Sequence, residues 1–216
     1  RIRQLHRFAE GAEMNTADRY WRWCGYTGDE ESQQLLLNYN SRSELFNRKK
    51  TLVHLPDGPF ALERMLRNDM SLVLPNDMLV KVDMMSMANS LEVRVPFLDY
   101  RVVAFAMSLP ADYRIGTQYG KLVLRKAFEG KLPEELFTRP KHGFEVPLLK
   151  WFRGDLRKMI EEEWLSDDFI IEQGIFECDK IRALIKQLFS NDPGDIEARI
   201  WALIVFQYWW KKYMIN

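Results

Sequence analysis

Apolar residues recur at helical spacing along most of the chain. In residues 181–189 they fall at i, i+3, i+4, i+7 and i+8, so they share one face of a helix. Residues 196–210 are apolar nearly all round, which is typical of a buried helix, and Asp195 stands where it can cap it. These patterns predict a mainly α-helical chain.

The middle of the chain contains two stretches with helical spacing, each preceded by a proline-containing break. Residues 56–59 read Pro-Asp-Gly-Pro and predict a break, with a helix starting just beyond it. Apolar spacing continues to Val73, and Pro75 then predicts a reset before a second helix over residues 78–89. Before this region, residues 30–55 are polar, and we expect them to be largely irregular.

Residues 91–95 change to a period of two. The alternation predicts a short extended segment with Glu92 and Arg94 on one side, ended by Pro96. Asp99 is placed to cap a helix over residues 100–108. Residues 116–120 predict a loop, followed by another helix.

Composition and charge exclude several classes of protein. The 216 residues include 31 basic and 31 acidic side chains, which argues against a dedicated binder of nucleic acid or anionic membranes. Tyr20, Trp21 and Trp23 lie among arginines, and we interpret them as a helix face packed on a neighbour rather than a base-stacking surface. The apolar run at residues 200–210 is shorter than the roughly 20 residues of a membrane span. Cys24 and Cys178 form no metal-binding or disulfide pattern, which suits a reducing cytoplasm.

General catalytic motifs for nucleotide binding, metalloproteases and serine hydrolases are absent. Two carboxylates, Asp69 and Asp83, instead interrupt apolar helical faces. Burial of such groups requires partners, and Lys81, Arg94 and Arg125 are the candidates. A structural ion pair and a catalytic carboxylate both fit this pattern.

Two further features carry candidate chemistry. Glu92 can orient or deprotonate an attacking amine, and Arg94 can hold a carboxylate; a solvated strand face is the alternative. Lys141 lies in a loop stiffened by Pro140 and turned by Gly143. Such a lysine can bring its charge to a phosphate or an oxyanion, and a solvated surface lysine is the alternative.

Three segments together resemble the synthetase domain of glutamine-dependent asparagine synthetases. Residues 74–99 read LPNDMLVKVDMMSMANSLEVRVPFLD and resemble the family's long signature. Residues 120–127, GKLVLRKA, resemble its Lys-x-x-Leu-Arg helix, and residues 139–147, RPKHGFEVP, resemble its Arg-Pro-Lys-x-Gly-Phe loop. Their order and spacing agree with the family, and the match is strongest over residues 60–154.

The resemblance implies an ATP-dependent amidoligase. In this family ATP and Mg²⁺ adenylate the side-chain carboxylate of aspartate, and ammonia from glutamine converts the adenylate to asparagine and AMP. The resemblance implies that Lys141 stabilises charge on the adenylate and pyrophosphate, and that Glu92 belongs to the base system. Asp83, Arg94 and Arg125 are implied as supporting residues around the substrate.

The resemblance also implies a fold and its partners. The chain would be the helical C-terminal portion of an α/β ATP-pyrophosphatase-type domain, of the adenine nucleotide α-hydrolase-like class. Residues 56–216 would form this part, and residues 1–55 a less closely matched segment of the same domain. The family's pyrophosphate-binding loop and N-terminal cysteine are absent from the 216 residues, so we expect ATP and Mg²⁺ to be bound mainly by upstream segments and the isolated chain to be inactive. The implied enzyme is cytoplasmic and binds aspartate, glutamine or ammonia, and ATP; a homodimer is one state that the resemblance allows.

One position departs from the family, and two other functions stay open. Met84 stands where many members carry arginine, so the chain lacks an ionic contact from that position. The first alternative is a related amidoligase that adenylates another carboxylate, in lactam formation or in peptide or sugar modification. The second is a non-catalytic helical interaction module. Substrate-dependent release of pyrophosphate separates the first alternative from an asparagine synthetase, and the second predicts a full-length parent that lacks the pyrophosphate loop or the N-terminal cysteine.

Overall fold

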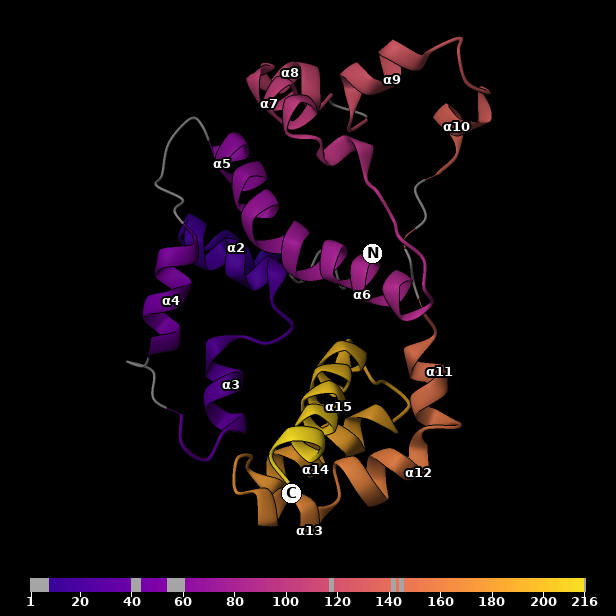
Figure 1. Ribbon diagram of the computed structural model, residues 1–216. Helices are drawn as coiled ribbons and strands as arrows, with labels where there is room; N and C mark the ends of the chain where they lie inside the picture. Colours follow the sequence, from indigo (N-terminus) through magenta and orange to yellow (C-terminus); the bar gives the residue numbers. More distant parts are fainter. Residues whose placement is uncertain are drawn as a thin grey trace. The chain divides into compact units, whose positions relative to one another are not determined.

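The computed structural model describes residues 8–39, 44–53, 61–116, 119–140, 143 and 146–215. The chain divides into two compact units (Figure 1), the first made of residues 1–53 and 145–216 and the second of residues 54–144. Across the described ranges the chain is mainly helical and has no strand, only two isolated antiparallel bridges. The expectation of a mainly α chain is therefore confirmed.

The first unit begins with short helices. A helical turn at residues 8–12 is followed by α2 (Thr16–Cys24), α3 (Asp29–Leu35) and α4 (Glu44–Leu52). The expectation that residues 30–55 are largely irregular is therefore wrong. Acidic residues in the first turn of α3 and lysines in the last turn of α4 complement the helix dipole, which favours helix in these polar stretches.

The aromatic side chains of α2 differ in their burial within the first unit. Tyr20 is buried, and the Trp21 indole Nε1 donates a hydrogen bond to the Lys49 carbonyl of α4 at 3.3 Å. The ring of Trp23 stacks on that of Phe8 with 6.1 Å between centroids. Tyr20 and Trp21 thus pack against neighbouring parts of the first unit, whereas Trp23 stays 37% exposed.

The core of the first unit lies in its C-terminal helices. These are α11 (Leu148–Arg153), α12 (Arg157–Met159), the π-helical η3 (Ile160–Trp164), α13 (Asp167–Gln173), α14 (Cys178–Leu188) and α15 (Ile196–Tyr213). The stripe expected at residues 181–189 places Ile181 and Leu188 in this core, both fully buried. The buried apolar cluster comprises Phe152, Ile160, Leu165, Ile170, Phe176, Ile181, Leu188, Ile196, Ile200, Leu203 and Ile204.

Two polar residues of α15 have partners within the first unit. Gln207 is fully buried, and its amide exchanges hydrogen bonds of 2.7 and 3.0 Å with that of Gln173 in α13. Asp195 occupies the N-cap position of α15 as expected, but its side chain does not cap the helix. It accepts a 3.0 Å hydrogen bond from Arg199 instead, because one turn of helix brings the two side chains together.

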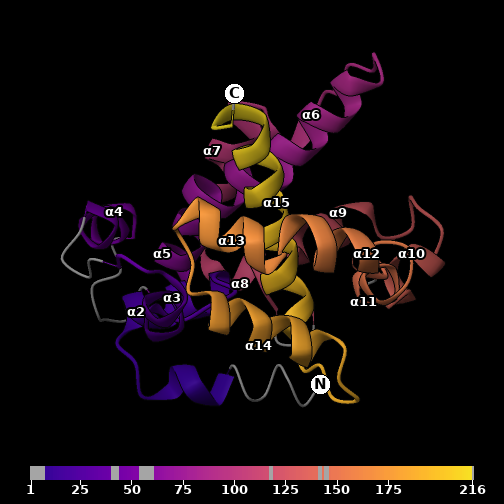
Figure 2. The ribbon, with the colours of Figure 1, turned by 90° about the horizontal axis from the view of Figure 1, so that it is seen from below.

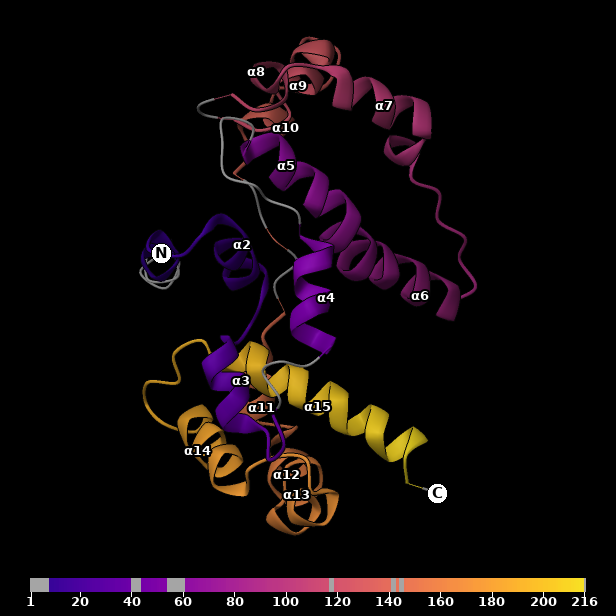
Figure 3. The same cartoon turned by 90° about the vertical axis from the view of Figure 1, so that its left-hand side faces the viewer.

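The early segment of the chain joins the core beside α14. Leu36 and Phe176 form an antiparallel bridge, and the Glu177 amide donates to the Leu35 carbonyl at 2.9 Å. Figures 2 and 3 show α3 next to α14 in the resulting arrangement. Residues from the two ends of the sequence thus build one unit.

The second unit starts with a long helical rod. It consists of α5 (Ala61–Asn68), the π-helical η1 (Asp69–Leu79) and α6 (Val80–Ala88), which run on without a break (Figures 1 and 3). A helix after Pro59 was expected, but the expected reset at Pro75 is wrong. In a π-helical stretch the hydrogen bonds shift to i→i+5, so the missing N–H and the ring of Pro75 do not end the rod.

The remaining elements of the second unit are short. They are η2 (Pro96–Leu98), α7 (Tyr100–Ser108), α8 (Ala111–Arg114), α9 (Leu122–Phe128) and α10 (Glu135–Thr138). Asn68 is the one buried residue among those described here, and no described apolar side chain of this unit is buried. On α6, Met84, Met85 and Met87 are each more than half exposed.

We find no helix in the described parts of the chain with the length and apolar character needed to cross a bilayer.

Candidate active site

The chain turns sharply where the predicted site begins, at the end of α6. The Leu91 amide donates to the Ser86 carbonyl at 2.9 Å, and the Ser90 amide donates to the Met87 carbonyl at 3.0 Å. This pair of hydrogen bonds is a Schellman motif. It places Ser90 at φ 56°, in the left-handed region where a residue with a Cβ is strained. The turn fixes the direction in which residues 91–95 leave the helix.

Glu92 and Arg94 form an ion pair on the segment between α6 and η2. The two side chains share a side, as the period of two predicted, although the segment forms no strand. Their exposed fractions are 65% for Glu92 and 88% for Arg94, so both charged groups are open to solvent or to a ligand. Because an exposed ion pair contributes little to stability, the pair is available for other contacts.

Asp99 fixes the other end of this segment. Its carboxylate accepts a 2.9 Å hydrogen bond from the Arg101 backbone amide and caps α7, as expected from the sequence. The Arg101 guanidinium also binds it through Nε and Nη2, at 2.9 and 2.8 Å. The side-chain hydrogen bond from Arg101 is the main reason why the pKa of Asp99 lies below its ordinary value.

Arg125, in the last turn of α9, is held between aromatic rings. Its guanidinium lies 4.6 Å from the Tyr119 ring centroid and 5.5 Å from that of Phe137, and it donates a hydrogen bond to the Phe137 carbonyl. Phe137 belongs to α10, and the chain continues from α10 into Arg139 and Pro140. Arg125 therefore anchors the helix that leads into the predicted lysine loop.

Lys141 itself lies outside the described residues, as do three of its neighbours at positions 142, 144 and 145. The described approach to the loop is ordered by a 2.9 Å hydrogen bond from the Arg139 amide to the Glu135 carbonyl. The assignment of Lys141 as the electrostatic catalyst stays a prediction.

The two helical carboxylates are not buried. Asp69 and Asp83 are both exposed, so the expectation that these carboxylates are buried is wrong. Both occur in a helical rod whose described apolar side chains are themselves not buried. Two of the expected partners bind elsewhere, Arg94 to Glu92 and Arg125 to Phe137. Among the described residues, no hydrogen bond joins Asp83, the Glu92–Arg94 pair and Arg125 to one another.

Sequence reasoning missed two residues that shape this region. Ser90 stands between the helix expected over residues 78–89 and the extended segment at residues 91–95 and was not singled out, yet it adopts a positive φ. Arg101 was not singled out, yet its position two residues after Asp99 allows the two-point contact with the capping carboxylate.

The described residues contain no cluster of metal-binding side chains. Across the described ranges, no group of three or more histidine, cysteine, aspartate or glutamate side chains is placed to hold a metal ion.

Comparison with known proteins identifies several relatives. The chain is 31% identical over 195 residues to asparagine synthetase (glutamine-hydrolyzing) 1 of Bacillus subtilis, an alignment that covers 89% of this chain and 30% of the relative. It is 39% identical over 149 residues to a Mycobacterium tuberculosis protein that carries the asparagine synthetase name, covering 68% of the chain and 22% of the relative. The chain thus spans less than a third of the length of these relatives. No solved structure matches it.

The family model for asparagine synthase matches residues 2–211. The match includes residues 2–55, where the sequence motifs gave the least support. Together with the relatives, it assigns the chain to the synthetase region of these enzymes. The chain belongs to the asparagine synthase family.

Proposed function

We propose that the chain is part of a glutamine-dependent asparagine synthetase. In the proposed reaction, ATP adenylates the side-chain carboxylate of aspartate with release of pyrophosphate. Ammonia released from glutamine then displaces AMP from the adenylate to give asparagine. The observation that carries the proposal is the Glu92–Arg94 pair, exposed between two fixed points of the family signature. Membership of the asparagine synthase family supports the same reaction class.

Glu92 and Arg94 have complementary roles in this proposal. The Glu92 carboxylate accepts a proton from the attacking ammonia, and the Arg94 guanidinium binds a carboxylate of the amino-acid substrate. The Schellman turn at Ser90 and the cap at Asp99 hold the segment that carries them from both ends. Such fixation favours catalysis, because charges that are already oriented need no reorganisation during the reaction.

Lys141 is the proposed electrostatic catalyst. Its ammonium stabilises the negative charge that develops on the adenylate and pyrophosphate. Arg125 acts as a positioning residue through its contacts with Tyr119 and Phe137, which anchor the helix before the lysine loop. Asp83, exposed on α6, is proposed to contact other residues around the substrate rather than the reacting atoms.

The proposed fold context is an α/β synthetase domain of the ATP-pyrophosphatase type. Residues 56–216 would form its helical part, with residues 1–55 as a further segment of the same domain. The relatives are more than three times as long as the aligned region, so other parts of a full-length enzyme would bind ATP and Mg²⁺.

The test measures pyrophosphate release from ATP by a full-length enzyme that carries this region, with and without L-aspartate. We expect aspartate-dependent release, and a decrease of about a hundredfold or more in Lys141→Met while glutaminase activity is retained, since one oriented charge contributes roughly 3 kcal/mol. Lys131→Met, an exposed lysine between α9 and α10, is the matched control and should keep full activity.

Two results would contradict the proposal. Release of pyrophosphate that is indifferent to aspartate would show that another carboxylate is adenylated. A complete absence of release in the wild type would point to a non-catalytic helical module.

A further inference from the structure

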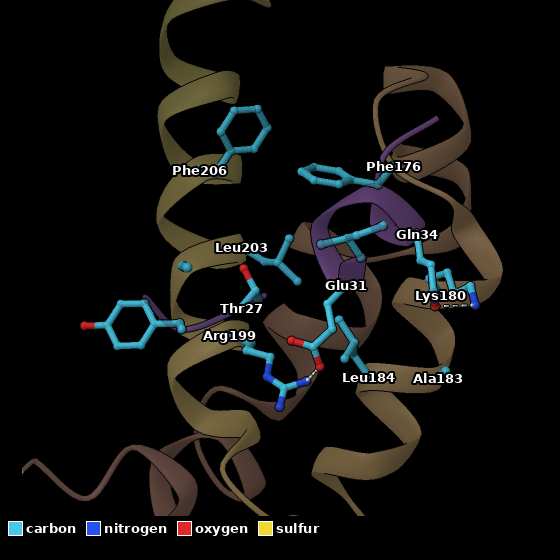
Figure 4. Close-up of a pocket in the computed structure, with 13 residues that line it drawn as sticks. Thr27, Glu31, Gln34, Phe176, Lys180, Ala183, Leu184, Arg199, Leu203 and Phe206 are labelled. Atoms are coloured by element: carbon cyan, nitrogen blue, oxygen red, sulfur yellow. Dashed lines mark hydrogen bonds and ion pairs between the residues drawn. The ribbon is translucent and has the colours of Figure 1, made fainter. Parts of the chain in front are cut away.

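A pocket of about 420 Å³ opens between α3, α14 and α15 in the first unit. None of the site residues expected from the sequence lines it. Its volume lies within the range of about 300–1,000 Å³ that is typical of small-molecule sites. Figure 4 shows the rings of Phe176 and Phe206 at one end and the Arg199–Glu31 pair at the other.

The lining of the pocket is mostly apolar. Phe176 and Leu203 are 7% and 6% exposed and form its inner wall, with Leu184 beside them. The rings of Phe176 and Phe206 meet edge to face, with 5.5 Å between centroids and 87° between planes. Because these apolar side chains face the pocket, an apolar ligand would remove their surface from water and form van der Waals contacts with them.

Polar links hold the three helices around the pocket in place. Arg199 of α15 donates to Glu31 of α3 at 2.9 Å, and Lys180 of α14 donates to the Gln34 side chain of α3 at 3.3 Å. The backbone hydrogen bond between Glu177 and Leu35 closes the same side. The pocket is therefore formed before a ligand arrives, which lowers the entropic cost of binding.

The charged side chains that line the pocket indicate which charge a ligand should carry. Both oxygens of Glu31 already accept hydrogen bonds, one from Arg199 and the other from the Gly28 amide at 3.2 Å. The charge of Glu31 is thus already paired with the Arg199 guanidinium. The Lys180 ammonium has three donors, and among the described residues its partner is the neutral amide of Gln34. An anionic group would complement it.

We propose that this pocket binds a small amphipathic carboxylate. The alkyl or aryl body lies against Phe176, Leu184 and Leu203, and the carboxylate pairs with Lys180 at the rim. The body supplies most of the affinity, at about fourfold for each buried methylene. The exposed lysine adds about two- to fivefold, because water screens an ion pair at the surface.

The experiment is a calorimetric titration of the 216-residue chain with octanoate, hexanoate and 1-octanol. Octanoate should bind at one saturable site, about fifteenfold more tightly than hexanoate, because it buries two more methylenes. Lys180→Gln should weaken octanoate binding by two- to fivefold and leave 1-octanol unchanged. Lys186→Gln, which removes a lysine of α14 that does not line the pocket, is the matched control and should change neither.

A second set of variants tests the location. Ala183 and Ala202 line the pocket from α14 and α15 and are both exposed, so tryptophan at either position fills space without disturbing the core. Ala183→Trp and Ala202→Trp should each abolish binding of octanoate and of 1-octanol, with circular dichroism used to verify that each variant is folded.

Three outcomes would overturn the proposal. The first is no saturable octanoate binding, or binding that survives both tryptophan variants. The second is an equal response of octanoate and 1-octanol to Lys180→Gln, which would remove the case for an anionic ligand. The third is self-association of the chain that Ala183→Trp abolishes, which would make a second copy the occupant.

Discussion

The backbone conformation of Ser90 lowers the stability of the folded chain. With φ 56° it occupies the left-handed position of a Schellman motif, which glycine adopts without strain. We predict that Ser90→Gly raises the free energy of unfolding by about 0.5–1 kcal/mol. Relief of the strain, about 1–2 kcal/mol, exceeds the added entropy of the unfolded chain. Urea denaturation followed by circular dichroism measures the change.

A serine-to-glycine substitution at an unstrained position separates the relief of backbone strain from the general effect of introducing a glycine. Ser71 lies inside the helical rod of the second unit, where glycine has only a cost, so Ser71→Gly should destabilise the chain by about 0.5–1 kcal/mol. Equal effects of the two substitutions would contradict the strain at Ser90. The strained residue stands two positions before Glu92, so the turn that costs stability also directs the proposed catalytic segment.

At the scale of the element, the cap of α7 predicts a dependence on pH. Hydrogen bonds from Arg101 lower the pKa of Asp99 in the folded chain, so the unfolded chain binds a proton more readily. The stabilisation is thus complete above the ordinary pKa of 3.8 and is lost as the pH falls through the lower folded pKa. We predict that wild type melts at a higher temperature than Asp99→Asn at neutral pH, and that the difference shrinks below about pH 4.

Thermal melts at a series of pH values test this prediction. Asn retains a capping side chain but not the charge, so the comparison isolates the contact with Arg101. Asp192→Asn, an exposed turn position, gives the baseline for removing one carboxylate. A difference between wild type and Asp99→Asn that persists unchanged to about pH 3 would contradict the assigned cause.

The elements divide into those that local sequence could predict and those that it could not. The cap at Asp99 and the buried stripe of α14 depend on residues within a turn or two, and both were predicted. The continuous rod through Pro75 was not, because a proline normally ends a helix and the π-helical bonding that accommodates it has no simple sequence signature. The charged helices α3 and α4 were not predicted, because their sequences contain too few apolar residues to show a helical periodicity.

At the scale of the whole molecule, contacts between residues far apart in the sequence could not be predicted from it. Arg199 binds Glu31 across 168 positions, and α3 packs beside α14 although the two helices lie at opposite ends of the chain. Local periodicity predicts which face of a helix is apolar, but not which helix covers it. The pocket between α3, α14 and α15 therefore could not be predicted from the sequence. The placement of Glu92 and Arg94 on one side of the chain could be predicted, because the two residues are only two positions apart.

The two units should also differ in how readily they open. In the first unit Ile181, Leu188 and Ile200 are fully or almost fully buried, whereas the second unit has no buried apolar side chain among its described residues. Local opening requires less free energy where fewer apolar contacts are lost. We predict that amide hydrogens of α14 and α15 exchange with deuterium at least about tenfold more slowly than those of α6, as measured by mass spectrometry. Equal protection would mean that contacts other than apolar burial stabilise α6.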